Sequence, residues 1–233
     1  MRLHYILLFS CVLSVLALTT PAPAAPPTAK PIDVTSTPQV MDTVVRIDNN
    51  GTFMGTGVVL TPEGHVITTT RVSNDAVSQR FTVGAARTKA VLLVNDSNHG
   101  LAILKMETPL PRFATLDSGA GPAKNDAVRV IARLYKGSEP PMIELRSTGA
   151  RVEDPHFRGD SATNMDLSDL LVIRLDGDGF DYGATGYAVF SPTSGWLQGI
   201  VIGRFEFGQN RLLAMSAPTI RKLFEDNKIA LPK

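Results

Sequence analysis

The chain has 233 residues, of which 43% are hydrophobic and 19% are charged, and its formal net charge is +1. This is the composition of a globular protein, and it excludes a chain that is disordered as a whole. Lysine and arginine are scattered along the sequence, so no basic patch is predicted for binding a polyanion. We therefore expect no nucleic-acid partner.

The first 25 residues have the pattern of a secretory signal peptide. Arg2 supplies a positive charge, an apolar run covers residues 6–18, and small residues follow at Ala22, Ala24 and Ala25. The run is shorter than the roughly 20 residues that a membrane-spanning helix needs. We predict cleavage near residue 25 and a periplasmic or secreted protein with no membrane span after cleavage. An uncleaved anchor is the alternative.

The single cysteine, Cys11, lies inside this apolar run. A lipid-modified cysteine should mark the end of such a run, and here the run continues beyond it, which favours an ordinary signal peptide over a lipoprotein anchor. Cleavage would leave no cysteine, so we expect no disulfide even in an oxidising compartment.

A Pro/Ala-rich segment, residues 26–40, follows the signal and is predicted to be an extended linker. Beyond it, short stretches rich in Val, Ile and Leu alternate with turn signals, which indicates a many-stranded β protein. We expect strands near 43–48, 54–60, 65–70, 80–84, 89–95 and 101–106, and then near 127–133, 142–150, 170–175, 186–190, 196–202 and 211–215.

A turn-rich connection at residues 109–126 separates the two sets of strands. We expect an N-terminal β-barrel over 41–125 and a C-terminal barrel over 126–233. After the last strand Ile220, Leu223 and Phe224 repeat at helical spacing, and Ser216 is the predicted N-cap. The expected fold is therefore all-β, with two six-stranded antiparallel barrels and a short C-terminal helix. Strand counting alone does not separate this fold from a sandwich.

Three segments resemble the trypsin-like serine proteases, and in particular their HtrA/Deg branch. Residues 55–72, GTGVVLTPEGHVITTTRV, resemble the strands that lead into the catalytic histidine. Residues 101–105, LAILK, resemble the strand that begins at the catalytic aspartate, and residues 183–189, GATGYAV, resemble the nucleophile loop. The order and spacing match over residues 41–226, so the resemblance implies the double-barrel fold of that family.

The catalytic positions implied by this resemblance carry other residues. Arg71 stands at the histidine position, Gly100 at the aspartate position and Thr185 at the serine position. Arginine stays protonated and offers only donors, so it cannot act as a base, and glycine has no carboxylate. An internal threonine without a base is a poor nucleophile. The resemblance also implies a vestigial oxyanion loop at Gly183 and Thr185, because backbone N–H groups survive side-chain replacement.

The acidic loop before Thr185 has two interpretations. Asp176, Asp178 and Asp181 suggest a calcium loop, but position five is Phe180 and position twelve is Tyr187, so the EF-hand register fails. We expect a polar loop, and Arg71 either pairs with one of its carboxylates, binds an anionic group of a partner or stays solvated.

The histidines show no metal-binding spacing, so we expect no metal and no cofactor. His65 and His156 are interpreted as isolated surface residues, and His99 as a surface histidine turned away from the cleft, because it lies one residue from position 100 on a strand. Trp196 is expected to be a core or strand-packing residue, whereas Phe205 and Phe207 are candidates for an exposed partner anchor.

The sequence thus favours a non-catalytic exported pseudoprotease that binds a protein or peptide in the cell envelope. The binding residues expected are Arg71 with Asp176, Asp178 and Asp181. An active serine-type endopeptidase with non-standard residues is the alternative. The sequence ends soon after the predicted helix, so no PDZ domain is expected to follow the barrels.

Overall fold

The computed structural model describes residues 38–73, 81–84, 87–136, 142–159, 167–177, 185–205 and 210–232. By contacts the chain divides into Met1–Lys30 and Pro31–Lys233, and the second unit contains every described residue. The predicted signal peptide and most of the predicted linker lie outside the described residues.

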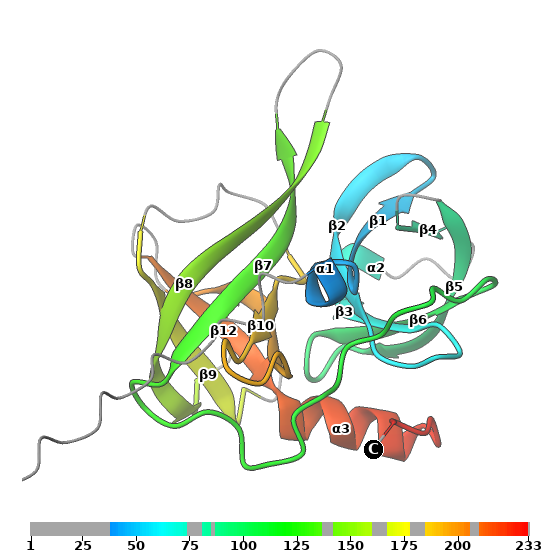
Figure 1. Cartoon of the computed structure of the whole chain (residues 1–233). Helices are drawn as coiled ribbons and strands as arrows, with labels where there is room; N and C mark the ends of the chain where they lie inside the picture. The colour runs from blue at the N-terminus through cyan, green and yellow to red at the C-terminus, as the bar shows by residue number, and fades with distance from the viewer. Residues whose placement is uncertain are drawn as a thin grey trace, which may run out of the picture. The chain divides into compact units, whose positions relative to one another are not determined.

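The first six strands form a closed antiparallel barrel in the order β1-β2-β3-β6-β5-β4 (Figure 1). Valine, isoleucine and leucine dominate the sides of the strands that face the interior, and β-branched residues suit a pleated, half-buried surface. The strands are β1 (Val44–Asn49), β2 (Thr52–Val59), β3 (His65–Thr69), β4 (Phe81–Val83), β5 (Thr88–Asp96) and β6 (Leu101–Met106).

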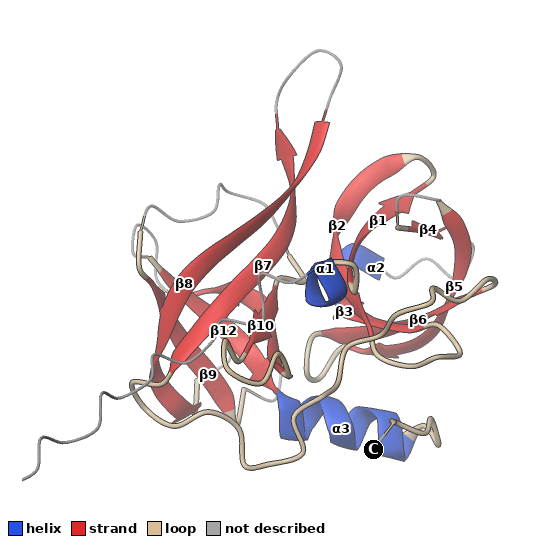
Figure 2. Ribbon diagram, viewed as in Figure 1, coloured by secondary structure: helices blue, strands red, loops and turns tan. Residues whose placement is uncertain are grey.

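The next six strands form a second closed antiparallel barrel in the order β10-β11-β12-β9-β8-β7 (Figure 2). They are β7 (Ala127–Lys136), β8 (Met142–Phe157), β9 (Leu170–Leu175), β10 (Ala188–Phe190), β11 (Leu197–Arg204) and β12 (Arg211–Ser216). Residues 107–126 connect the two barrels.

Pairing between the first and last strands of each sheet order decides that both sheets are closed. Strand β1 pairs with β4 and β10 pairs with β7, so no strand is left as an edge. The predicted two six-stranded barrels with a C-terminal helix are therefore confirmed, and the sandwich that strand counting left open is excluded by these two pairings.

One apolar cluster joins the barrels to the C-terminal helix α3 (Ala217–Asp226). It contains Val44 and Ile103 of the first barrel, Phe190 of the second and Phe224 of α3, all of them fully buried. Since neighbouring strands share these contacts, the helix and both barrels stabilise one another through a common core.

The end of the predicted linker was wrong, whereas Ser216 was predicted correctly as the N-cap of α3. A short helix, α1 (Pro38–Met41), includes residues 38–40 of the predicted linker, because Val40 and Met41 pack against the common core. Ser216 occupies the N-cap position of α3 but makes no capping hydrogen bond. Its hydroxyl lies 3.5 Å from Asp169 Oδ2 and 3.2 Å from Thr219 Oγ1 instead.

Among the described helices, none has the length and apolar character required to cross a lipid bilayer.

Candidate functional site

The fold brings together the three segments that carry residues 71, 100 and 185. Arg71 lies in the short helix α2 (Thr70–Ser73), directly after β3, and Gly100 precedes β6. The Thr70 N–H donates to the Gly100 carbonyl at 3.0 Å, and the Thr56 N–H donates to the Thr185 carbonyl at 3.1 Å. Backbone bonds thus tie position 100 to α2 and position 185 to β2 of the other barrel.

Gly55 on β2 is the point where α2 and the Thr185 segment meet. A Cβ atom at Gly55 would lie 2.8 Å from Val72 Cγ2 and 2.9 Å from the Thr185 carbonyl oxygen, closer than van der Waals contact permits. Glycine is therefore required here for the second barrel to approach α2 so closely. Segments far apart in the sequence are brought into contact here.

The side chains at the three positions differ in access to solvent. The Arg71 side chain is exposed, and no hydrogen bond or ion pair joins it to Asp176 among the described residues. Thr185 is only 8% exposed. Gly100 is buried and has φ 67°, a left-handed conformation that costs an L-residue roughly 1–2 kcal/mol.

The acidic loop is only partly described. Asp176 is exposed, and its N–H donates to the Gly149 carbonyl at 2.9 Å, which fixes the start of the loop against β8. Asp178, Asp181 and Gly183 lie outside the described residues. Within the part of the chain that the structure describes, no three His, Cys, Asp or Glu side chains gather in a way that would hold a metal ion.

Comparison with known proteins gives matches among solved structures only. No family model matches the sequence, and no curated protein matches it. The active form of the Rv3671c protease from M. tuberculosis is 20% identical with a TM-score of 0.65, over 94% of this chain and 97% of that one. The HtrA-type protease AlgW with a decapeptide is 16% identical with a TM-score of 0.66, over 82% of this chain and 65% of that one.

A third similar structure is the MamO protease domain from Magnetospirillum magneticum, 19% identical with a TM-score of 0.61, over 79% of this chain and 97% of that one. The chain has the fold of trypsin-like serine proteases. At these identities the likeness establishes the fold alone.

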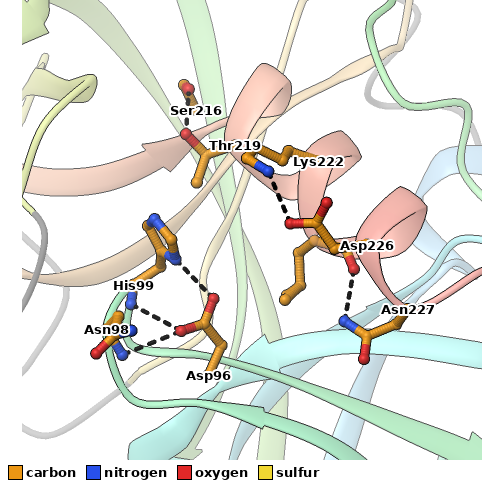
Figure 3. A network of polar contacts seen from close by, with 9 residues as sticks. Asp96, Asn98, His99, Ser216, Thr219, Lys222, Asp226 and Asn227 are labelled. Carbon is orange, nitrogen blue, oxygen red and sulfur yellow. Dashed lines mark hydrogen bonds and ion pairs between the residues drawn. The ribbon is translucent and has the colours of Figure 1, made fainter.

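His99 lies next to position 100 in this trypsin-like fold, but its ring is held by Asp96 (Figure 3). The His99 Nδ1 atom is 2.6 Å from Asp96 Oδ2, and Asp96 Oδ1 accepts the backbone N–H groups of Asn98 and His99. The side chain of His99 is 28% exposed. The Asp96 carboxylate, four residues before position 100, is thus engaged by His99 and by the backbone.

Several aromatic and histidine predictions require correction. His65 is not an isolated surface residue: it is half-buried, bonded to Thr61 Oγ1 through Nδ1 at 2.7 Å and edge-on to Phe224. Trp196, expected to be a core or strand-packing residue, is 41% exposed. Phe205 packs edge-on against Phe157 with a centroid distance of 5.0 Å, so this residue is half-buried where an exposed anchor was suggested. Phe207 lies outside the described residues.

His65 makes the stability depend on pH. Burial, together with the positive charge of Lys105, lowers the pKa of His65 below its ordinary value of 6.5, while Glu63 opposes the shift. Below pH 6.5 the unfolded chain therefore binds this proton more readily than the folded protein, and stability falls as pH decreases through that window.

Between pH 7 and pH 5 we expect the free energy of unfolding to fall less for His65→Gln than for the original protein. Urea denaturation at each pH measures this difference. The free energies of unfolding of the two proteins at pH 7.5 are the control for changes in packing, because at this pH the His65 ring is largely neutral in both the folded and the unfolded chain. An acid loss that is the same in both proteins would exclude this role of His65.

A set of charged residues that the sequence interpretation missed lies around a pocket between the barrels. Asp42, Arg46, Arg112 and Arg133 line it. No motif connects them, because they come from β1, β7, the connection 107–126 and the residue after α1. These residues could be grouped only once the strand register and the path of the connection 107–126 are known.

Proposed function

We propose that the protein is an exported pseudoprotease: a non-catalytic module that binds a protein or peptide segment in the cell envelope, alone or as a subunit of a larger assembly. The observation that carries this proposal is the set Arg71, Gly100 and Thr185 at three segments that the fold brings into one site.

A trypsin-like mechanism needs a base and an orienting carboxylate, and neither group is present at these positions. Arg71 is a permanent cation with donors only, so it cannot accept the proton of an attacking hydroxyl. Gly100 has a left-handed backbone with φ 67°, which suits glycine and disfavours the side chain that an orienting residue would need. The left-handed backbone at position 100 therefore agrees with the absence of a side chain there.

Thr185 retains a hydroxyl, but neither Arg71 nor Gly100 supplies the base that would activate it. It is 8% exposed, and its carbonyl is engaged by the Thr56 N–H. Loss of a triad member typically leaves only about 10³–10⁴-fold catalysis over water, from substrate binding and backbone donors. Turnover at that level would not support a protease.

The same site can still bind a partner. Arg71 presents an exposed guanidinium, and its planar donor pair matches a carboxylate of a bound peptide. AlgW, which shares the fold over 65% of its own chain, was solved with a decapeptide. Asp176, Asp178 and Asp181 precede position 185 and would supply the opposite charge for a basic residue of the partner.

The alternative function is an active serine-type endopeptidase with unusual residues. Two observations favour it: the hydroxyl of Thr185 is retained, and Rv3671c and AlgW are named as proteases.

Incubation with unfolded casein separates these two functions. We expect the purified chain to release no more peptide than Thr185→Ala does, because neither protein has a base for the hydroxyl. An active protease of the same fold serves as the positive control. Cleavage by the original chain that disappears in Thr185→Ala would contradict the proposal and support the alternative.

The binding half of the proposal is tested by cross-linking in the native cell envelope, affinity purification and mass spectrometry of the captured proteins. We expect a recurring stoichiometric partner whose recovery falls in Arg71→Ala, with Arg151→Ala as the matched exposed control. A monomer with no recurring partner would contradict the binding role.

A further inference from the structure

A pocket of about 620 Å³ lies where β1, the end of β4, β7, β8 and the connection 107–126 meet. Strands β1 and β7 belong to different barrels and contact each other here. Its lining contains none of the residues 71, 100 and 185. A cavity of this size is typical of small-ligand sites, which range from about 300 to 1,000 Å³.

Three guanidinium groups reach this pocket from different parts of the chain. Arg46 lies on β1, Arg133 on β7 and Arg112 in the connection between the barrels. Convergence of three arginines is costly unless their charges are compensated, because like charges at short range repel one another. Their partners therefore decide what the pocket can accept.

Two of the three guanidiniums have a carboxylate partner. Arg46 Nη2 lies 2.6 Å from Asp48 Oδ1, and Arg112 Nη1 lies 2.7 Å from Asp42 Oδ2. Asp48 is fully buried and also lies 3.9 Å from Arg87 Nε.

Arg133 is held differently. Its Nε donates to the Val44 carbonyl at 3.0 Å, and no ion pair to Arg133 occurs among the described residues. It is half-buried, and burial is the main cause that lowers its pKa below the ordinary value, with Arg46 adding to the effect and Asp42 opposing it. Among the described residues, Arg133 is thus the one guanidinium of the three without a direct ion pair, although Asp42 acts on it electrostatically.

The remaining walls of the pocket are apolar. Val45 is 3% exposed, and Leu110, Pro111 and Ile143 complete this side of the lining. An inorganic dianion would leave these apolar walls unused, and Asp42 would repel it more strongly than a single negative charge. A single carboxylate joined to an aliphatic body would pair with the Arg133 guanidinium and bury its carbon atoms against the walls.

We propose that this pocket binds an aliphatic monocarboxylate, with its carboxylate on Arg133 and its hydrocarbon part against Val45, Leu110 and Ile143. Two sources present this chemistry: a free aliphatic acid and the C-terminal residue of a peptide that ends in an apolar side chain. The ligand contacts both barrels and the connection, so binding it also links the two barrels.

Isothermal titration calorimetry with the purified chain tests this proposal. The probes are octanoate, an acetylated Ala-Val-Leu tripeptide with a free carboxylate, and the C-terminal amide of the same tripeptide, each added up to about 10 mM. We expect at least one carboxylate probe to bind and the amide not to bind. Whether octanoate or the tripeptide binds more tightly identifies the source.

Substitutions in the pocket show whether the measured heat of binding comes from this site. Arg133→Gln should weaken carboxylate binding roughly ten- to hundred-fold, because a charge-assisted hydrogen bond is lost. Arg151→Gln, an exposed arginine of β8 outside the lining, should leave binding unchanged. If Arg133→Gln does not fold by circular dichroism, Arg112→Gln serves in its place: its side chain is 46% exposed, and its loss releases Asp42, whose carboxylate then competes with the ligand for Arg133.

Three results would overturn the proposal: no binding of either carboxylate probe, binding of the amide as tight as that of the acid, or affinity unchanged by the folded pocket variants. None of them depends on the casein or cross-linking results. The experiments therefore test the pocket and the proposed function independently.

Discussion

Gly186→Ala is expected to destabilise the protein by about 2–5 kcal/mol, the sum of overpacking and an unfavourable backbone conformation. A Cβ atom at Gly186 would lie 2.0 Å from the Thr56 carbonyl oxygen, and the residue has φ 81°. The obstructing atom is backbone, which cannot rotate away as a side chain can. Any side chain at position 186 therefore pushes the Thr185 segment off β2 of the first barrel.

Urea denaturation followed by circular dichroism measures this effect. Gly177→Ala is the matched control: nothing lies within 4 Å of a Cβ atom at Gly177, and the residue does not have a positive φ. We expect that control to change the free energy of unfolding by less than about 0.5 kcal/mol. Equal stability of the two variants would mean that positions 185–186 do not pack against Thr56 as described.

Phe224→Ala is expected to cost about 3–5 kcal/mol, the usual loss for a buried phenylalanine. Phe224 is fully buried in the cluster that contains residues of both barrels and α3, and the edge of its ring faces His65 with a centroid distance of 6.5 Å. Its removal leaves a cavity where helix and barrels meet, so the whole protein should unfold at lower denaturant concentration.

The control for this prediction is Phe113→Ala, which removes the same side chain from a site where it is 37% exposed. We expect a loss of less than about 1 kcal/mol, measured by the same urea denaturation. If Phe224→Ala were no more destabilising than Phe113→Ala, the helix would not contribute to the common core.

The predicted strands agree closely with the structure, and the reason is local. Stretches of Val, Ile and Leu between turn residues mark strands because β-branched side chains fit a pleated surface regardless of their partners. The C-terminal helix was predicted for a similar reason, from the spacing of Ile220, Leu223 and Phe224. The residues at positions 71, 100 and 185 were also read directly from the sequence, because the segments that resemble the protease family give their positions.

Tertiary contacts decided the rest. Helix α1 forms because Val40 and Met41 find apolar partners in the common core, which a linker composition does not reveal. Trp196 is exposed although tryptophan is usually largely buried, because it lies in the loop before β11 and not on the strand itself.

The sequence by itself determined the strand pattern, the C-terminal helix and the residues at the positions that resemble a triad. Only the tertiary structure decided that both sheets close, that Gly100 has a left-handed backbone and that Arg46, Arg112 and Arg133 surround one pocket. The physical reason is range: propensity and spacing act between neighbours in the chain. Closure, backbone strain and charge convergence arise from contacts between residues far apart in the sequence.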